Sequence, residues 1–455
     1  MPASRLVSVL GLAFGDCGKG LFTDALCRRW PVHSVVRFNG GAQAGHNVVL
    51  PDGCHHTFAQ FGSGTLVRGV ATVLAHPVVV HPTALLVENE RLGAKGIDDA
   101  LARLTIDARC PVNTAFHQAA GRLREIARGA RAHGTCGVGV GETVRHRLGH
   151  PDEALSYGEL TSPARALRKL EAIRLRLRDE FSGFGREWAE TPTARRERAL
   201  LADQRVAETW LAACTPLLRE VPPASPEQIA ARLDRPGAVL FEGAQGVLLD
   251  EDHGFHPHTT WSSIGTPAVD AVARDYGLSG EIEHLGVLRA YLTRHGPGPM
   301  PTADPALDVL REPHNSAHGW QGAFRRGHPD AVLLDYAVSV VGRLDGLLVS
   351  HLDAVERVRC LRWCAAYELP RRPGDGQLCV RNPARRERVE RLRPGSAGAL
   401  DRQARLTALL SRATPAYEPE RITGAGELIE RLEAVAGCRV RFVSAGPSHR
   451  SVSAR

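Results

Sequence analysis

The stretch Val7-Ser-Val-Leu-Gly-Leu-Ala-Phe-Gly-Asp-Cys-Gly-Lys-Gly20 joins a short apolar run to a glycine-rich loop. Apolar runs of this length, bounded by glycine, are typical of strands buried on both faces of a parallel sheet. The glycines let backbone N–H groups approach phosphate oxygens at the start of a helix, and Lys19 adds a positive charge. The stretch therefore predicts a strand, a phosphate-binding loop and a helix in succession.

This loop is not a regular Walker A motif. Ala13 occupies its first glycine position, and Gly20 stands where a Mg²⁺-binding Ser or Thr is expected. A strand-to-helix turn with an incidental lysine is the alternative for the loop alone, but Lys19 is one of only three lysines in the chain, which favours phosphate binding. Asp16, inside the loop, could bind Mg²⁺ or act as a base.

Similar apolar runs recur along the chain, at 34–38, 71–75, 238–241, 285–288 and 347–349, after a first run at 6–12. Amphipathic segments such as 22–30 and 82–92 lie between them. This alternation indicates an α/β fold with a large, mostly parallel central sheet and surrounding helices. We expect one domain over 1–455, with a helical insertion at about 162–233 and a peripheral excursion at about 371–412. Ser162 and Pro163 would open the insertion as N-cap and first helical residue.

The composition of the 455-residue chain is that of a globular protein, with 43% apolar and 24% charged residues, which excludes a disordered chain. A formal charge of +7 favours anionic ligands. A nucleic-acid-binding protein would share this charge, and its binding would depend steeply on salt. However, the arginines alternate with acidic residues and no aromatic side chains are interleaved with them. We therefore expect no nucleic-acid partner.

Cysteine spacing and the apolar stretches indicate the compartment. The ten cysteines form no C-x-x-C pair and no closely spaced framework, as in a reduced, cytoplasmic protein. The first apolar residues lead directly into the glycine-rich loop rather than into a signal-peptide cleavage site. The most apolar region, 70–87, is interrupted by histidines and prolines, whereas a membrane span needs ~20 uninterrupted apolar residues. We expect a cytoplasmic protein that does not cross a membrane.

A second glycine-rich stretch, Arg37-Phe-Asn-Gly-Gly-Ala-Gln-Ala-Gly-His46, follows the next expected strand. Its glycines permit close approach of a ligand, and His46 can donate or accept a proton near neutral pH. A single histidine is often structural, but ligands of open α/β sheets bind at the carboxyl ends of strands. We therefore expect His46 to be functional.

Two further regions place polar groups after apolar runs. In Leu240-Phe-Glu-Gly-Ala-Gln-Gly246, Gln245 is suited to hydrogen-bond a carbonyl or amide edge. The acidic residues at 250–252 could bind a metal, or could serve as capping and turn residues. Leu347-Leu-Val-Ser-His-Leu-Asp353 and Phe442-Val-Ser-Ala-Gly446 each end in a polar turn. An aspartate in such a place can accept two hydrogen bonds from the N1–H and N2–H₂ groups of guanine.

Together and in this order, these motifs resemble the adenylosuccinate synthetase family. The similarity extends from Val7 to about Arg450. It also includes Gly134-Thr-Cys-Gly-Val-Gly-Val-Gly141 and Tyr291-Leu-Thr-Arg-His-Gly-Pro-Gly-Pro299. The resemblance implies the P-loop-related fold of that family.

The resemblance also implies an activity. Enzymes of the family use GTP and Mg²⁺ to join the amino group of L-aspartate to C6 of IMP, giving adenylosuccinate, GDP and phosphate. Asp16 would remove the N1 proton of the purine so that O6 attacks the γ-phosphate, and His46 would stabilise the transferring phosphoryl group as a donor. Gln245 would hold the 6-oxygen. Positioning and charge stabilisation account for most of the catalysis in such transfers.

Binding residues follow from the same resemblance. The nucleotide-monophosphate site would comprise Gln43, Thr135, Cys136, Arg147, Gln245 and Thr260; the GTP site Gly15, Gly18, Lys19, Gly20, Asp353, Ser444 and Gly446; and the Mg²⁺ site Asp16 and the Gly45 carbonyl. Arg325 and Arg326 would bind the amine donor. The family is dimeric, which implies a homodimer in which Arg145 or Arg147 reaches the monophosphate site of the neighbouring subunit.

Several positions depart from the family pattern. Cys17 stands where the family has Glu, Cys136 where it has Thr, and His351 where it has Lys. The largest departure is Gly319-Trp-Gln-Gly322, which takes the place of the family's Thr-Thr-Gly-Arg aspartate loop.

These departures leave alternatives open. One is a specialised paralogue that uses another purine monophosphate, such as a guanylate, or another amino acid. The other is a catalytically silent, GTP-binding regulatory protein, which would need neither Asp16 nor His46. The presence of both residues favours an enzyme.

Overall fold

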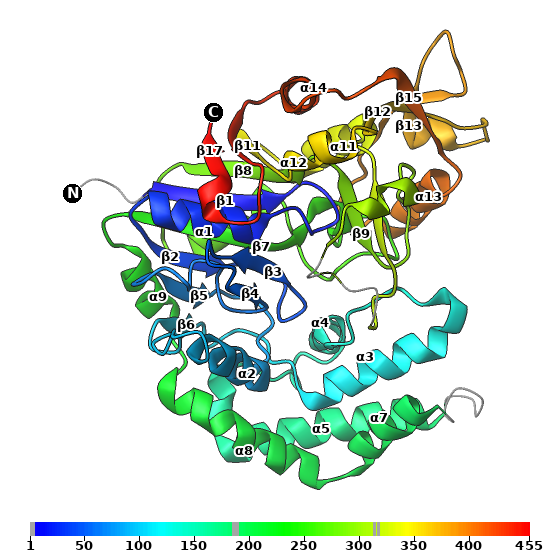
Figure 1. Cartoon of the computed structure of the whole chain (residues 1–455). Coiled ribbons are helices and arrows are strands. Elements are labelled where there is room, and N and C mark those ends of the chain that lie inside the picture. Colours follow the sequence, from blue (N-terminus) through cyan, green and yellow to red (C-terminus); the bar gives the residue numbers. More distant parts are fainter. Residues whose placement is uncertain (1–4, 184–190, 313–314, 316–318) are drawn as a thin grey trace.

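A nine-stranded sheet forms the centre of the molecule (Figure 1). The computed structural model describes residues 5–183, 191–312, 315 and 319–455. Neighbouring strands follow the order β17-β16-β11-β8-β1-β7-β2-β5-β6, and all pairs are parallel except β16 with β17. The strands are β1 (Arg5–Gly11), β2 (Val32–Arg37), β5 (Ala71–Leu74), β6 (Leu104–Ile106), β7 (Ala238–Gly246), β8 (Ile282–Arg289), β11 (Gly346–Ser350), β16 (Val440–Ser444) and β17 (Val452–Ala454). The predicted α/β fold with a large, mostly parallel sheet is confirmed.

Successive side chains of β1 enter two different cores, because neighbouring residues of a strand point to opposite faces. Leu6 and Leu10 pack into the core on one face of the sheet. Val7 and Val9 pack into the core on the other face. A strand buried on both faces is apolar throughout, which explains why the sequence shows continuous apolar runs. All six runs predicted from the sequence coincide with strands of this sheet.

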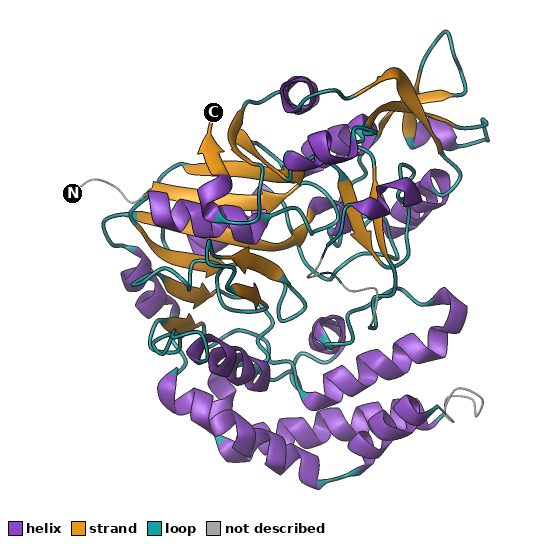
Figure 2. Ribbon diagram, viewed as in Figure 1, coloured by secondary structure: helices purple, strands orange, loops and turns teal. Residues whose placement is uncertain are grey.

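Helices cover both faces of the sheet (Figure 2). One face packs against α1 (Lys19–Arg29). On the other face lie α10 (Thr266–Asp275), α11 (Ala331–Val341) and α14 (Ala425–Ala436). The remaining helices are α2 (Pro82–Gly93), α3 (Ala115–Arg128), α4 (Val140–Gly149), α5 (Pro163–Ser182), α7 (Pro192–Ala202), α8 (Arg205–Glu220), α9 (Pro226–Leu233), α12 (Asp353–Val358) and α13 (Leu400–Leu410).

A helical layer lies beyond the β6 edge of the sheet, at the bottom of Figure 1. Helices α3, α5, α7 and α8 share a third core that includes Leu170 and Trp210. Pro163 is the first residue of α5, as predicted, but the Ser162 side chain makes no capping hydrogen bond. The interval 162–233 thus contains α5, α7, α8 and α9 among its described residues. Its status as an insertion remains a prediction.

Three small antiparallel sheets flank the central one. Strands β3 (His46–Val49) and β4 (His55–Phe58) form one pair, and β9 (Leu292–His295) and β10 (Phe324–Gly327) form another. A four-stranded sheet comprises β13 (Cys379–Arg381), β14 (Arg388–Leu392), β12 (Arg362–Glu368) and β15 (Thr414–Arg421). The interval 371–412 contributes β13, β14 and α13 to this region. The β3–β4 and β9–β10 pairs carry residues of the candidate site.

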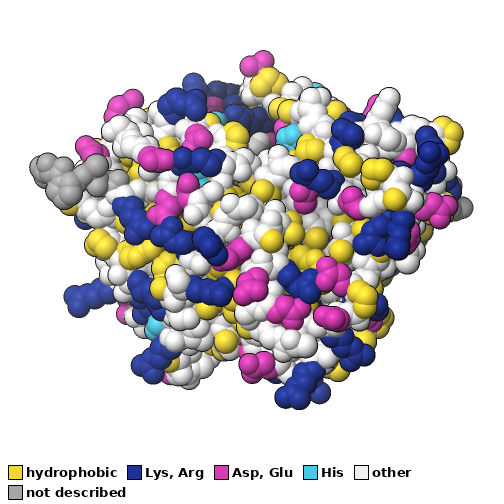
Figure 3. All heavy atoms as spheres, turned by 90° about the horizontal axis from the view of Figure 1, so that it is seen from above, with side chains coloured by type: hydrophobic (Ala, Val, Ile, Leu, Met, Phe, Trp, Pro, Cys, Tyr) yellow, Lys and Arg dark blue, Asp and Glu magenta, His cyan; other side chains and the backbone are white. Residues whose placement is uncertain are grey.

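The surface is of mixed charge. Basic and acidic side chains intermingle on the face shown in Figure 3. All ten cysteines are free thiols, as the sequence led us to expect of a reduced protein. In the part of the chain that the structure describes, no helix has both the length and the apolarity required to cross a membrane.

Candidate active site

The glycine-rich loop connects β1 to the first residue of α1. Gly15 and Gly18 have φ angles of 107° and 96°, in the left-handed region that disfavours residues with a Cβ. A Cβ at Gly18 would also lie 2.9 Å from the Ser350 hydroxyl oxygen. The loop therefore brings bare backbone to the N-terminus of α1, where N–H groups can bind phosphate. Lys19 is buried there, and its Nζ donates to the Gly15 carbonyl at 2.5 Å.

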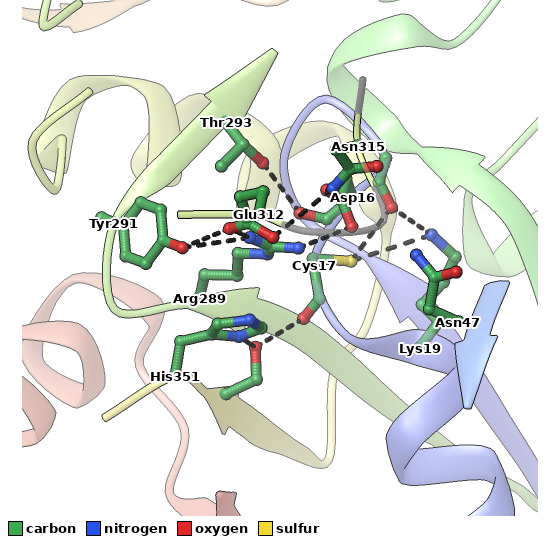
Figure 4. A network of polar contacts seen from close by, with 12 residues as sticks. Asp16, Cys17, Lys19, Asn47, Arg289, Tyr291, Thr293, Glu312, Asn315 and His351 are labelled. Atoms are coloured by element: carbon green, nitrogen blue, oxygen red, sulfur yellow. Dashed lines mark hydrogen bonds and ion pairs between the residues drawn. The ribbon is translucent and has the colours of Figure 1, made fainter. Parts of the chain in front are cut away.

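Asp16 lies at the centre of a polar network in this loop (Figure 4). Its Oδ1 is 2.7 Å from Arg289 Nη2, and its Oδ2 accepts a hydrogen bond of 2.7 Å from Asn315 Nδ2. The Thr293 hydroxyl donates to the Asp16 carbonyl at 3.0 Å. Burial alone would raise the pKa of Asp16, but the Arg289 guanidinium holds it below the usual value. Asp16 is thus a carboxylate whose two oxygens are both engaged.

Arg289 is a member of the network that the motifs did not reveal. It ends β8, is almost fully buried, and also contacts Glu312 and the Tyr291 hydroxyl. Two carboxylates and one guanidinium therefore share this buried position. A charged residue at the carboxyl end of an apolar strand was the available signal in the sequence.

His46, the first residue of β3, lies beside the end of β7. Its Nδ1 is 2.8 Å from Glu242 Oε1, and its Nε2 is 3.0 Å from the Ala244 carbonyl oxygen. Burial lowers the pKa of His46, whereas the Glu242 carboxylate acts in the opposite direction. The ring is therefore held at both nitrogens, and Nε2 points at the turn that carries Gln245.

Glu242 is fully buried within β7 and was not singled out from the sequence. Its Oε2 accepts a hydrogen bond of 3.0 Å from the Ser63 backbone N–H and lies 3.8 Å from Arg37 Nη1. The Ser63 hydroxyl donates to Oε1. Burial would raise the pKa of Glu242, but His46 first, and then Arg37 and Ser63, bring it down to about 2. Glu242 is therefore an ionised carboxylate in the interior.

Gln43 and Gln245 carry buried amide groups without a hydrogen-bond partner among the described residues. A Cβ at Gly40 would lie 3.0 Å from Gln245 Oε1, and one at Gly41 would lie 3.2 Å from Gln43 Oε1. Both amides thus adjoin the same glycine turn, close to the backbone. Because buried polar groups are normally hydrogen-bonded, two unpartnered amides at one glycine turn indicate a ligand with hydrogen-bond donors and acceptors.

The other predicted monophosphate residues lie on two adjacent loops. Thr135 and Cys136 precede α4, and the Thr135 N–H donates to Glu125 Oε1 at 3.1 Å. Thr260 is followed by Trp261, whose ring would lie 3.1 Å from a Cβ at Gly141 in the first turn of α4. The structure thus brings these two loops together.

The two arginines considered for the neighbouring subunit both lie on α4. Arg147 Nη2 is 3.1 Å from His76 Nε2. Arg145 is about half exposed and pairs with Glu142 and Glu180.

The predicted guanine residues lie at the ends of two neighbouring strands. Asp353 begins α12 directly after β11, and its carboxylate pairs with Arg357 at 3.1 Å. The Leu352 N–H donates to the Ser444 carbonyl at the end of β16, at 3.0 Å. The Ser444 hydroxyl donates to the Gly446 carbonyl at 2.7 Å. The structure thus brings Asp353, Ser444 and Gly446 together at the carboxyl ends of two neighbouring strands, β11 and β16.

The two predicted amine-donor arginines are engaged within the chain. Arg325 Nη2 donates to the carbonyls of Gly296 and Gly298 at 2.7 and 2.9 Å. Arg326 pairs with Asp308 at 2.9 Å and donates to the Leu310 carbonyl at 2.6 Å. Both arginines belong to β10, whose partner strand β9 contacts Asp16 through Thr293. The hairpin therefore adjoins the candidate base.

Trp320 lies in the stretch 319–322 and packs against neighbouring loops. Its ring carbon Cδ1 would lie 2.4 Å from a Cβ at Gly137, and the Arg122 guanidinium lies 5.9 Å from the ring centroid. Beside it is a cavity of about 370 Å³ lined by Glu125, Ile126, Ala132, Gly319 and Trp320. The loop that carries Trp320 thus packs against the loop that carries Thr135.

The oxygen groups near the phosphate loop suit Mg²⁺. No cluster of three or more His, Cys, Asp or Glu side chains that could hold a metal occurs among the described residues. Mg²⁺ is commonly bound by one or two carboxylates together with substrate phosphates and water. The Asp16 carboxylate in the phosphate loop is a ligand of this kind when a nucleotide supplies further oxygens.

Comparison with protein families gives one match over nearly the whole chain. A family model described as "Adenylosuccinate synthetase" matches residues 8–453. The adenylosuccinate synthetase of Mycobacterium sp. (strain KMS) is 31% identical, covering 98% of this chain and 96% of the relative. That of Neisseria gonorrhoeae (strain NCCP11945) is 30% identical, covering 98% and 97%.

Two solved structures share the fold. Fully ligated adenylosuccinate synthetase from Plasmodium falciparum has a TM-score of 0.78 at 20% identity, covering 99% of this chain and all of that chain. Cyanophage S-2L succinoaminodeoxyadenylate synthetase, bound to dGMP and to dATP as an energy donor, has a TM-score of 0.60 at 16% identity, covering 99% and 95%. At these identities the likeness concerns the fold alone.

Proposed function

Since the chain belongs to the adenylosuccinate synthetase family, we propose that its active site is the group of side chains around Asp16, His46 and Gln245. The protein is a GTP-dependent C–N ligase that joins IMP and L-aspartate to give adenylosuccinate, GDP and phosphate. The assignment of the site is carried by the convergence of three segments: His46 and the phosphate loop both lie against the turn that carries Gln245. His46 Nε2 lies 3.0 Å from the carbonyl of Ala244, the residue before Gln245, and a Cβ at Gly15 would lie 3.6 Å from the Gly246 N atom.

The first chemical step is the activation of the purine 6-oxygen. Asp16 removes the proton from N1, and the charge that develops on O6 makes it a nucleophile toward the γ-phosphorus. Gln245 holds O6 through its amide group. For N1 to reach Asp16 Oδ2, the Asn315 amide must leave that oxygen, while Arg289 can remain on Oδ1.

Donors around the γ-phosphate stabilise the transfer. With its ring still held by Glu242, His46 Nε2 donates to a phosphoryl oxygen that lies beside the Ala244 carbonyl. Lys19 and the N–H groups of the loop bind the phosphates. Asp16 and the Gly45 carbonyl would hold Mg²⁺, which would neutralise charge on the phosphates. The Asp353 carboxylate binds the guanine of GTP.

In the second step, the amino group of the donor displaces phosphate from C6 of the 6-phosphoryl intermediate, because phosphate is a better leaving group than hydroxide. Arg325 and Arg326 lie on the hairpin next to Asp16, where they can bind the donor's carboxylates. Each would then exchange a carbonyl contact within the chain for a carboxylate, which is a stronger acceptor for a guanidinium. We further propose that the protein works in the cytoplasm as a homodimer.

One observation favours a second candidate. The loop at 319–322 presents Gly319 and Trp320 where the family has two threonines, and both nearby arginines are engaged within the chain. This arrangement suits a specialised paralogue that uses another amino acid or another purine monophosphate, such as a guanylate.

Steady-state assays with GTP separate the two candidates. We expect saturable formation of adenylosuccinate from IMP and L-aspartate, with no other pair in a panel of purine monophosphates and amino acids turned over faster. A higher kcat/KM for another pair would favour the paralogue. Absence of phosphate release with every pair would favour a catalytically silent GTP-binding protein.

A further inference from the structure

Glu242 is a charged residue in a strand that is otherwise apolar up to the glycine turn. It pairs in register with Val9 of β1 and Arg37 of β2, so neighbouring strands enclose it on both sides. Transfer of a lone carboxylate into such an interior is strongly unfavourable. An apolar side chain of similar volume would avoid that cost. The carboxylate therefore calls for a reason beyond packing.

Its contacts supply the reason. Four groups face the Glu242 carboxylate: the His46 ring at 2.8 Å, the Ser63 backbone N–H at 3.0 Å, the Ser63 hydroxyl, and the Arg37 guanidinium at 3.8 Å. Ser63 and Arg37 fix the position of the carboxylate without themselves reaching the reacting groups. His46 is then held through Nδ1, which leaves one orientation for the imidazole plane.

We infer that Glu242 is a positioning residue for His46: it fixes the ring so that Nε2 is directed at the transferring phosphoryl group. This inference rests on the proposed role of His46. In the structure, His46 Nε2 lies 3.0 Å from the carbonyl oxygen of Ala244. Ala244 immediately precedes Gln245, which holds the purine oxygen. A rotation of the ring about its Cβ–Cγ bond would break the Glu242 contact and turn Nε2 away from this turn. The carboxylate therefore keeps the donor beside the atoms that react.

A merely structural role for Glu242 is the competing explanation, because the Ser63 contact anchors the segment after β4. The chain offers a matched control in Glu88. This carboxylate is also buried, accepts N–H groups of Ala59 and Gln60 at 2.9 and 3.0 Å, and lies 3.8 Å from His56. Glu88→Gln thus perturbs the same segment and another buried Glu–His pair, but leaves His46 untouched.

The test is a double-mutant cycle on the full chain, with Glu242→Gln, His46→Asn and the combined variant. We expect Glu242→Gln to lower kcat about a hundredfold while the KM values for GTP and IMP stay within about threefold, as for other residues that orient a reacting side chain. In the His46→Asn background the same change should cost less than about twofold, because its effect passes through the ring. Glu88→Gln should leave kcat within about twofold.

The inference would be overturned if Glu242→Gln lowered kcat by the same factor in the wild type and in His46→Asn. It would also be overturned if Glu242→Gln left the kcat of the wild type unchanged. If His46→Asn itself leaves turnover unchanged, the proposed role of His46 fails instead, so the two failures are distinguishable. Should Glu242→Gln not fold, Glu242→Asp keeps the charge but withdraws the carboxylate by one methylene. We expect this variant to lose at least about tenfold in kcat, and wild-type kcat would contradict us.

A spectroscopic measurement complements the kinetics. Long-range ¹H–¹⁵N spectra, with the His46 ring signals assigned from the His46→Asn variant, report the hydrogen bond at Nδ1. We expect the Nδ1 signal of His46 to move in Glu242→Gln and to stay in place in Glu88→Gln. An Nδ1 signal that is the same in the wild type and in Glu242→Gln would contradict the proposed contact.

Discussion

Gln245 keeps both polar atoms of its amide buried and unpartnered among the described residues. Replacement by leucine, which has a similar volume, removes no hydrogen bond within the protein. We therefore expect Gln245→Leu to unfold at the same temperature as the wild type or higher. The KM for IMP should rise at least about tenfold, because the 6-oxygen loses its donor. An unchanged KM in steady-state assays would remove Gln245 from the site.

Residues differ in how far the sequence alone reveals them. Asp16, His46 and Gln245 are flanked by glycines after apolar runs, so their placement at strand ends could be predicted. Glu242 and Arg289 could not be assigned roles, because each role depends on a partner that lies far away in the sequence. A charge within or at the end of a buried strand signals a partner, but it does not say which one.

At the scale of elements, Asp107 connects the edge of the sheet to α10. It follows β6, and its carboxylate accepts hydrogen bonds of 2.7 Å from Arg109 Nη2 and from the Tyr276 hydroxyl, directly after α10. Burial would raise the pKa of Asp107, but these hydrogen bonds, with Arg109 first, hold it below its ordinary value of 3.8. The ionised form is therefore favoured in the folded state.

The consequence is a stability contribution that depends on pH. Because the folded pKa lies below the unfolded one, the contribution is complete above pH 3.8 and disappears as the pH falls below it. We expect Asp107→Asn to lower the free energy of unfolding by about 1–3 kcal/mol at neutral pH. Denaturant titrations should show this difference shrinking in acid. A difference that stays constant or grows as the pH falls below 3.8 would contradict the assignment.

Long apolar runs made the central strands of the sheet predictable. The hairpins could not be predicted, because β3 with β4 and β9 with β10 are short, partly buried pairs whose stability comes from tertiary contacts. For the same reason, the sequence assigned Arg325 and Arg326 to the donor site but could not show their contacts within the chain. The two guanidinium groups bind backbone carbonyls, and Arg326 also pairs with Asp308.

At the scale of the whole molecule, a shared active site makes activity depend on association. If Arg147 completes the site of the neighbouring subunit, Asp16→Asn and Arg147→Leu should each be inactive alone. Mixing them in equal amounts should restore about a quarter of the wild-type activity, because half of the dimers are mixed and each of these has one intact site. Sedimentation should show a dimer. No recovery in mixtures that have exchanged subunits would place Arg147 outside the site of its neighbour, and Arg145 is the next residue to test.

Removal of the purine N1 proton by the Asp16 carboxylate is tested by comparing turnover with GTP binding in Asp16→Asn. Asparagine keeps the shape of the side chain and can still contact Asn315 and Arg289. We expect a loss of about a thousandfold in kcat, with a dissociation constant for GTP, measured by calorimetry in the absence of Mg²⁺, within about threefold of the wild type. Turnover at the wild-type rate in this variant would contradict this role of Asp16.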